Sequence, residues 1–317
     1  MVAEHPPTGA VLALDIGGTK TAAGLFGQDG DLLRVVRAPT PVGAGPQALF
    51  DLVAALLRDV AGYSAVSGIG VGCGGPMYWP AGIVSPLNIP DWVDFPLREA
   101  LASVYHGVPV RVHNDAVCVA VAEHWRGVGV GTRNLLGMVV STGVGGGLVL
   151  DGRLVSGATG NAGHIGHVVV DVDGPACACG GRGCLEAVAS GPNLVRWASD
   201  QGWSPAPGGT WTGESLAASA AAGHPVALAA FDRAGSALGT AIASAVQLTD
   251  VEVVAVGGGL AGAGDLLFAP LARQYARHAG LGFARRPRVA PASLGVHAGL
   301  VGAAALVLAG DVYWTGS

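Results

Sequence analysis

The sequence predicts an α/β fold built from two similar halves, and three observations carry this prediction. Apolar segments typical of strands alternate with segments whose apolar residues recur at helical spacing. A strand, a glycine-rich turn and a second strand occur near the start of the chain and again near its middle. The chain has 317 residues, half of them apolar, which suits about two domains with cores of their own.

The first half opens with a hairpin and continues as alternating helices and strands. Val11–Leu14 and Ala22–Phe26 are apolar strands on either side of a glycine-rich turn. No helical pattern follows this turn, which excludes the strand, glycine loop and helix of a dinucleotide or Walker site. The later elements are a helix over Pro46–Ala61, a strand over Ile69–Gly72, a helix over Leu97–Tyr105 and a strand over Val108–Val112.

The second half repeats the hairpin, with strands over Leu135–Ser141 and Leu148–Leu150 and a turn over Thr142–Gly147. Further elements follow: helices over Gly191–Ser199, Glu214–Ala222 and Pro225–Leu248, a strand over Val251–Val256, and helices over Leu266–Ala279 and His297–Ala309. We therefore expect a smaller N-terminal domain of residues 1–113 and 298–317, and a larger C-terminal domain of residues 114–297. Ligands are expected in the cleft between these domains.

Composition excludes several classes of protein. The net charge is −5, and the 17 basic residues include a single lysine, Lys20, which argues against a basic surface for nucleic acid. The longest apolar stretch, Ala298–Ala309, is shorter than the roughly 20 residues of a membrane helix. The first nine residues have neither the basic nor the apolar region of a signal peptide. We expect a soluble, cytoplasmic protein.

Two glycine-rich turns are candidate phosphate sites. In Asp15–Thr21, main-chain N–H groups at Gly17 and Gly18 can approach a phosphate, and Thr19 adds a hydroxyl. Asp15 would hold Mg²⁺ directly or through water, and Lys20 lies either near phosphate or in solvent. An ordinary hairpin turn is the alternative.

The second turn, Ser141–Gly147, includes Thr142 and Gly143, and together the two turns suggest a clamp on one nucleotide. A third run, Gly257, Gly258 and Gly259, follows a strand and suits the close approach of a purine. A plain strand-to-helix turn explains this last run equally well.

Asn114 and Asp115 directly follow a predicted strand, where α/β proteins gather site residues. We assign Asp115 as a general base that would deprotonate a hydroxyl for attack on a γ-phosphoryl group. A turn or a helix cap is the alternative.

A cysteine cluster gives the strongest local signal. His167, Cys177, Cys179 and Cys184 offer four ligands within 18 residues, which suits a structural zinc ion with no open coordination position. Free thiols packed in an apolar environment are the alternative, and this is the expected state of Cys73 and Cys118. Glu186 follows the last ligand closely, so the metal would hold its carboxylate in place to position a polyol.

These motifs resemble those of the ROK family of sugar kinases, over roughly Val11 to Ala309. The matching segments are Asp15–Thr21, Asn114-Asp115, Ser141–Gly147, Gly166-His167 and Cys177–Glu186. The resemblance implies a two-domain ATPase fold of the actin/hexokinase (ribonuclease H-like) type, use of ATP with Mg²⁺, and a homodimer or homotetramer. It also implies sugar contacts from Asn114, Asp115, His167 and Glu186, with Gly74, Gly75 and Asn88 in a sugar-facing loop.

One position departs from the family pattern. Family kinases carry Glu-x-Gly-His before the cysteine cluster, whereas this chain has His164 in place of the glutamate. An imidazole can donate as well as accept a hydrogen bond, so we expect a hexose analogue, such as an amino sugar or a cyclitol. In the alternative, His164 contacts glucose through one nitrogen.

The motifs together favour an ATP-dependent kinase that phosphorylates the 6-hydroxyl of glucose or of a hexose-like analogue. The alternative is a sugar-binding or regulatory ROK protein with little or no kinase activity. Only 14 residues precede Asp15 and the chain is acidic, which disfavours the DNA-binding repressors of the family.

Overall fold

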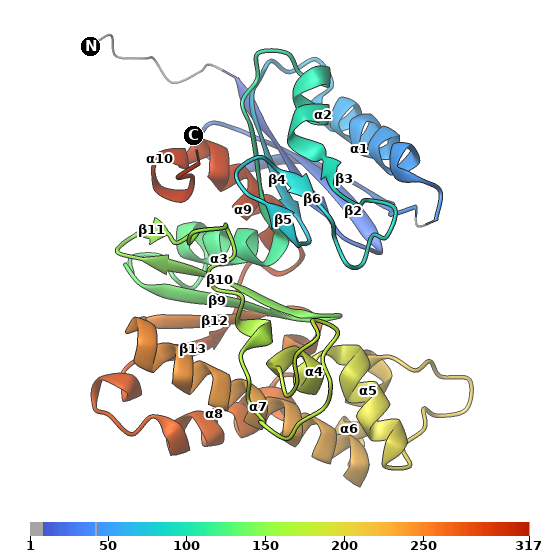
Figure 1. Ribbon diagram of the computed structural model, residues 1–317, viewed down its shortest axis with the longest axis vertical. Coiled ribbons are helices and arrows are strands. Elements are labelled where there is room, and N and C mark those ends of the chain that lie inside the picture. The colour runs from blue at the N-terminus through green and yellow to red at the C-terminus, as the bar shows by residue number, and fades with distance from the viewer. Residues whose placement is uncertain (1–8, 42, 317) are drawn as a thin grey trace. The chain divides into compact units, whose positions relative to one another are not determined.

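The computed structural model describes residues 9–41 and 43–316, which fold as two compact units (Figure 1). Unit 1 contains the described residues up to Gly127, together with Arg153–Ala162 and the residues from Val296 onward. Unit 2 contains Val128–Gly152 and Gly163–Gly295. This division differs from the expected one, because residues 115–126 form a helix that packs within unit 1 and residues 153–162 return to that unit.

The main sheet of unit 1 has the strand order β3-β2-β1-β4-β8. β1 (Ala10–Ile16) pairs antiparallel with β2 (Lys20–Phe26) and parallel with β4 (Val66–Cys73), which pairs parallel with β8 (Val110–Asn114). The other strands are β3 (Leu32–Pro39), the small sheet of β5 (Met77–Tyr78), β6 (Ile83–Val84) and β7 (Phe95–Pro96), and β11 (Arg153–Leu154). The helices are α1 (Pro46–Ala61), α2 (Leu97–Val104), α3 (Asp115–Arg126), α9 (Ala298–Leu308) and α10 (Gly310–Tyr313).

Unit 2 repeats this plan. Its strands run β10-β9-β12-β13, with β9 (Leu135–Val140) antiparallel to β10 (Val144–Leu150) and parallel to β12 (Val253–Gly257). β13 (Arg288–Pro291) pairs parallel with β12. The helices are α4 (Leu185–Ala189), α5 (Gly191–Asp200), α6 (Gly213–Ala221), α7 (Pro225–Thr249) and α8 (Asp265–His278). The order β10-β9-β12-β13 matches β2-β1-β4-β8 of unit 1, with the same parallel and antiparallel pairings. The two halves therefore share one plan, as expected.

Short 3₁₀ helices complete the fold at Ile165–His167, Gly259–Ala263, Phe283–Arg285 and Gly295–His297. Within the described ranges, no helix combines the length and the apolar character that a bilayer-spanning helix requires.

The second glycine turn is shorter than expected. Gly145, Gly146 and Gly147 belong to β10, where they pair with residues of β9. The expected turn over Thr142–Gly147 is therefore wrong after Gly143, because the ladder continues through glycines that local sequence favours in turns. The turn itself is closed by a hydrogen bond from Ser141 N to Gly143 O of 2.8 Å.

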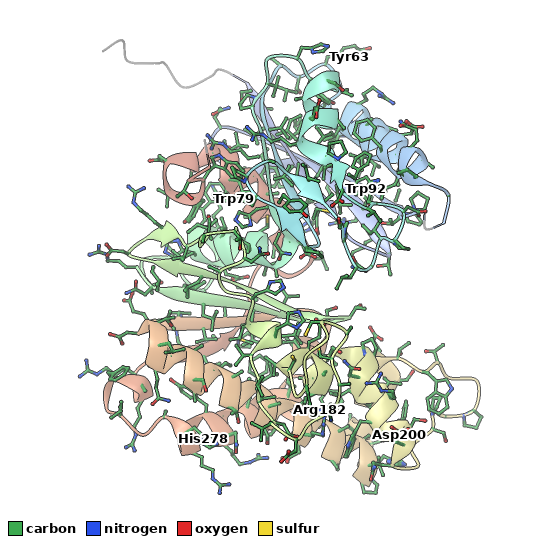
Figure 2. The ribbon with its side chains drawn as sticks, viewed as in Figure 1. Tyr63, Trp79, Trp92, Arg182, Asp200 and His278 are labelled. Atoms are coloured by element: carbon green, nitrogen blue, oxygen red, sulfur yellow. The ribbon has the colours of Figure 1, made fainter. Side chains whose placement is uncertain are left out.

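The apolar core of unit 1 lies on one face of its sheet, under α1 and α2. Leu12, Leu14 and Ile16 of β1 are fully buried there. Trp92, labelled in Figure 2, belongs to the same core and stacks on Phe95 with 4.5 Å between ring centroids. These aromatic rings add a large apolar area to a core of mostly aliphatic residues.

The opposite face of β4 carries glycines, which lets α9 lie directly on the sheet. A Cβ atom at Gly70 would come within 1.8 Å of the Ala303 carbonyl oxygen of α9. A Cβ atom at Gly302 of α9 would come within 1.7 Å of the Cys118 carbonyl oxygen of α3. Because these neighbours are backbone atoms, no side-chain rotation could relieve the clash, and the packing of α9 requires glycine at both positions.

We predict that Gly70→Ala lowers the free energy of unfolding by about 3 kcal/mol or more, because its methyl group would force α9 away from β4. Denaturant unfolding followed by circular dichroism measures the loss. Gly282→Ala is the matched control, since Gly282 has helical dihedral angles and no atom within 4 Å of its added Cβ. Equal stability of the two variants would contradict the tight packing.

Candidate functional site

The candidate residues of unit 1 gather at one edge of its sheet. β1, β4 and β8 are parallel, so their carboxyl ends meet, and the register pairs Asp15 with Gly72 and Cys73 with Asn114. Asp115 follows as the first residue of α3. Two segments far apart in the sequence, on either side of β4, therefore bring Asp15 and the Asn114-Asp115 pair to one edge of the sheet.

Asn88 connects the first glycine turn with the sugar-facing loop. A Cβ atom at Gly18 would lie 2.9 Å from Asn88 Cβ, and one at Gly74 would lie 3.3 Å from Asn88 Oδ1. A Cβ atom at Gly75 would lie 3.4 Å from Asn114 Nδ2. The expected phosphate turn and the expected sugar loop are thus in contact.

The first turn is tight and well supported. Gly17 N donates to Lys20 O at 3.1 Å, Thr40 Oγ1 donates to Gly17 O at 2.6 Å, and Thr19 O accepts from Thr40 N. Lys20 is exposed as the first residue of β2. These three hydrogen bonds hold the backbone of residues 17–19 in one conformation.

Asn114 and Asp115 also cap the N-terminus of α3, which agrees with the helix cap given above as the alternative for this pair. Asn114 Oδ1 accepts from Ala116 N at 3.0 Å, and Asp115 Oδ1 accepts from the same N–H at 2.8 Å. Burial raises the pKa of the Asp115 carboxyl, and backbone hydrogen bonds oppose part of that effect.

Asp15 shares this poorly solvated region. Burial, and then the charge of Asp115, raise the pKa of Asp15 to about 6. Its carboxylate lies against the first turn of α9, where a Cβ atom at Gly299 would be 2.5 Å from Asp15 Oδ2. Burial also raises the pKa of the Cys73 and Cys118 thiols well above the usual range, so both are inert buried groups, as expected.

His113 was not among the expected site residues. The Nδ1 atom of His113 accepts a hydrogen bond from Asn114 N at 2.8 Å, and its ring centroid lies 5.8 Å from that of Trp79. Burial lowers the pKa of His113 to about 4. A neutral imidazole therefore holds the backbone just before the Asn114-Asp115 pair. The only sequence signal was a histidine at the end of an apolar strand.

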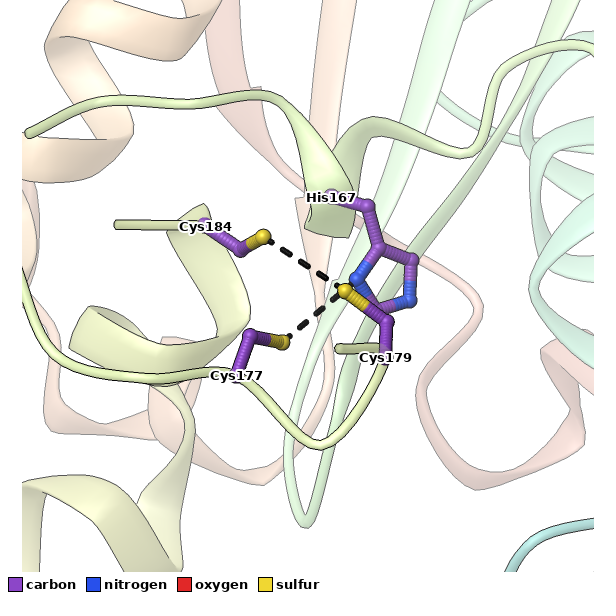
Figure 3. A group of neighbouring side chains, drawn as sticks. All are labelled: His167, Cys177, Cys179 and Cys184. Atoms are coloured by element: carbon purple, nitrogen blue, oxygen red, sulfur yellow. Dashed lines mark hydrogen bonds between the residues drawn. The ribbon is translucent and has the colours of Figure 1, made fainter. Parts of the chain in front are cut away.

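In unit 2 the four candidate metal ligands converge. The ligand atoms of His167, Cys177, Cys179 and Cys184 all lie within 4.8 Å of one another (Figure 3). Cys179 Sγ is 3.7 Å from Cys184 Sγ, and Cys177 Sγ is 3.8 Å from His167 Nδ1. Zinc–sulfur bonds of about 2.3 Å at tetrahedral angles place sulfur atoms about 3.8 Å apart, so this donor set fits Zn²⁺.

His164 and Glu186 flank the cluster. The rings of His164 and His167 lie 5.1 Å apart, and burial, then His167, lower the pKa of His164 while Glu186 raises it. Glu186 lies in the first turn of α4, and its Oε2 accepts from Val144 N at 2.8 Å. The carboxylate expected to bind sugar thus contacts the second glycine turn.

A cavity of about 530 Å³ in unit 2 borders that turn. Ser141 and Thr142 line it on the side of the turn, and Gly259 lines it as the start of a 3₁₀ helix. Gly257 ends β12, and Gly258 packs on β9, where its Cβ atom would be 2.4 Å from Val140 O. Neither of these two expected residues is among the lining residues, whereas Gly259 is.

Most of the cavity wall was not expected from the sequence. Its further lining residues are Gly191, Pro192, Val195, Trp211, Thr212, Gly213, Glu214, Ala217, Leu260, Gly262 and Ala263. The exposed Trp211 packs edge-on against the buried Trp203, with ring centroids 5.5 Å apart. A tryptophan in a glycine- and proline-rich loop was the available signal.

The model of the ROK family matches residues 11–309 of this chain. The chain belongs to the ROK family. The glucokinase of Thermotoga maritima is 33% identical over 311 residues, which cover 94% of this chain and 96% of that relative. The N-acetylmannosamine kinase of Shigella boydii is 36% identical over 250 residues, which cover 78% and 82%.

A ROK family glucokinase from Streptomyces griseus, solved in complex with glucose and AMPPNP, has a TM-score of 0.80 and 32% identity. The match covers 94% of this chain and 99% of that chain. The comparisons confirm the expected family and enzyme class, a phosphotransferase that acts on a sugar, and the mixed α/β fold of a ROK kinase. The likeness to actin and hexokinase stays a prediction.

The raised pKa of Asp15 predicts a pH-dependent stability. Between its ordinary pKa of 3.8 and about 6, the folded state binds the Asp15 proton and the unfolded state does not. Asp15 therefore costs stability as pH rises through that window, and the cost is complete above pH 6. We expect Asp15→Asn to raise the free energy of unfolding by roughly 1–3 kcal/mol at pH 7.5 and by far less at pH 4.

Denaturant unfolding at the two pH values measures this effect. Asp59→Asn is the control, because Asp59 is exposed and pairs only with the exposed Arg34 among its described partners, an ion pair of small value. A pH-independent effect of Asp15→Asn would contradict the assignment.

The cysteine cluster predicts about one zinc ion per chain in purified protein. Cys184→Ala should abolish zinc retention and lower the melting temperature, because metal binding orders the loop around the cluster. Cys118→Ala should retain zinc, since Cys118 is a buried thiol of unit 1. Metal analysis after dialysis measures both variants, and equal zinc contents would refute the site.

Proposed function

We propose that this chain transfers the γ-phosphate of ATP to the 6-hydroxyl of a hexose or a hexose-like analogue. The observation that carries the proposal is that the first glycine turn, the sugar-facing loop and the Asn114-Asp115 pair lie next to one another in unit 1. Asn88 touches the first glycine turn and the sugar-facing loop, and that loop adjoins Asn114, next to Asp115. A donor phosphate on the turn and an acceptor on the loop would thus be neighbours.

Asp115 is the proposed general base. Its carboxylate would accept the proton of the 6-hydroxyl while that oxygen attacks the γ-phosphorus and the bond to the bridging oxygen of ADP breaks. The products are the phosphorylated sugar, ADP and a protonated Asp115, which returns its proton to solvent. The raised pKa of Asp115 favours this role, because it makes the carboxylate a stronger base.

The Asp15 carboxylate supplies an oxygen ligand beside the first turn, which fits a Mg²⁺ ion that also binds nucleotide phosphates. Bound Mg²⁺ neutralises charge on the transferred phosphoryl group. Asp15 would hold the ion directly or through water, while the Gly17–Thr19 turn offers backbone and hydroxyl groups to phosphate.

We assign the cavity of unit 2 to the nucleotide. Ser141 and Thr142 would face its phosphates, and the apolar wall that includes Leu260 and Trp211 suits a flat, weakly polar base. An inorganic phosphate donor would leave this wall unused. The cavity therefore favours a nucleotide as the donor.

The cluster of His167 and three cysteines would hold zinc as a structural ion, with all four ligand positions filled by protein. Nδ1 of His167 faces Cys177, so Nε2 is the nitrogen that a sugar hydroxyl could reach. Glu186 and His164 lie beside it and complete the proposed sugar contacts of unit 2.

The acceptor is the less determined substrate. Relatives named for glucose and for N-acetylmannosamine phosphorylation are similarly close to this chain, so identity alone does not choose between them. His164 favours a hexose analogue, such as an amino sugar or a cyclitol, because its neutral ring can accept a hydrogen bond and also donate one. A carboxylate at this position would only accept.

The test is ADP release with ATP and Mg²⁺ over a panel of glucose, mannose, amino sugars, N-acetylated amino sugars and cyclitols. We expect turnover, with at least one analogue preferred to glucose. A preference for glucose over every analogue would contradict the interpretation of His164. No turnover with any compound would favour a sugar-binding or regulatory role.

Asp115→Asn should lower kcat by about 1,000-fold or more and leave the sugar Kd within about threefold, because the amide fills the same space without accepting a proton. Asp59→Asn is the matched control and should keep wild-type turnover. Retained activity of Asp115→Asn would remove the base assignment.

A further inference from the structure

The segment from Cys184 to Gly191 ties the cysteine cluster to the second glycine turn. Cys184 precedes α4, and Leu185 N donates to Val168 O at 2.9 Å, close behind the ligand His167. At the turn, Val144 N donates to Glu186 Oε2 and Gly191 N donates to Ser141 O, both at 2.8 Å. The turn is therefore held at one end by α4, through Glu186, and at the other by the first residue of α5, Gly191.

The position of Glu186 is itself fixed. Its main-chain oxygen accepts from Asn193 Nδ2 at 2.8 Å and from Ser190 N at 3.1 Å. Its neighbour Leu185 is fully buried. A Cβ atom at Gly143 would come within 2.8 Å of Glu186 Oε2, so a side chain there would displace this carboxylate from its present position. These contacts are all internal to unit 2.

This arrangement gives Glu186 a task beyond contact with sugar. Ser141 and Thr142 line the cavity assigned to the nucleotide. Glu186 binds the N–H of Val144, the residue that directly follows their turn. A carboxylate beside a phosphate site repels the ligand, so its presence there calls for a compensating gain. A charge-assisted hydrogen bond that keeps the turn in one conformation provides such a gain.

We propose that Glu186 is a positioning residue for the phosphate donor, which holds the second glycine turn through the Val144 N–H. The role rests on the proposed function, because it requires the cavity beside the turn to bind a nucleotide. A residue that only contacted sugar would leave nucleotide affinity unchanged when sugar is absent. Nucleotide binding without sugar is therefore the decisive readout.

The experiment measures the Kd of AMPPNP with Mg²⁺ by calorimetry, on full-length protein as purified and without sugar. Glu186→Ala removes the acceptor and should raise the Kd about tenfold. Glu186→Gln keeps an oxygen that can accept from Val144 N, so its Kd should stay within about threefold of wild type. Glu186→Gln thus tests a turn that still has a hydrogen-bond acceptor of the same shape, whereas Glu186→Ala tests a turn that has lost it.

Glu252→Ala is the matched control. Glu252 Oε2 accepts from the backbone N–H groups of Arg133 and Asn134, just before the start of β9 and at the end of that strand remote from the turn. This variant loses comparable hydrogen bonds in the same unit and should bind AMPPNP like wild type. A similar loss of affinity in Glu252→Ala would reduce the effect of Glu186→Ala to general destabilisation and overturn the proposal.

The remaining outcomes are also decisive. Wild-type or tighter AMPPNP binding by Glu186→Ala would overturn the positioning role and leave the proposed function intact. Weakened binding by Glu186→Gln to the level of Glu186→Ala would show that the charge matters rather than the acceptor, and would also overturn it. Failure of the wild-type protein to bind AMPPNP would overturn the proposed function together with this role.

Discussion

The site in unit 1 depends on the contact of α9 with the glycine face of β4. Because Gly70 and Gly302 carry no side chains, α9 packs backbone against backbone with both the sheet and α3. Its first turn reaches the Asp15 carboxylate at Gly299, while α3 begins at Asp115. Larger residues at these contacts would separate the helices from the sheet edge, and the two carboxylates would lose their shared, poorly solvated environment.

That environment explains why the site is costly for the fold and useful for a reaction. Burial raises the pKa of both Asp15 and Asp115, and the charge of Asp115 raises the pKa of Asp15 further. The N-terminus of α3 offsets part of the cost through the Ala116 N–H, which both Asn114 and Asp115 accept. A bound cation and the proton of an incoming hydroxyl would relieve the rest, so ligand binding and relief of repulsion coincide.

Local sequence patterns were sufficient to predict a helix where the apolar periodicity is strong, and a metal site where the ligand residues are chemically distinctive. The helix over Pro46–Ala61 was predicted with its observed bounds, and the four cysteine and histidine ligands come together as expected. Long-range effects account for the misses. β10 starts at Val144 because ladder pairing overrides the turn preference of its glycines, and α3 was not recognised after Asp115. Glu186 meets a turn 42 residues away, and no local signal reports such a hydrogen bond.

The glycine content follows from the same packing logic more than from ligand binding. The chain has 53 glycines, and the candidate phosphate turns and cysteine cluster use few of them. In unit 2, a Cβ atom at Gly235 of α7 would be 2.6 Å from Leu267 O of α8, and one at Gly239 would be 2.5 Å from Leu271 O. Both units therefore gain tight helix contacts by leaving out side chains, in α9 on its sheet and in α7 on α8. Each such contact exchanges backbone entropy for dense packing, and the partner strands and turns then hold site residues with little freedom to move.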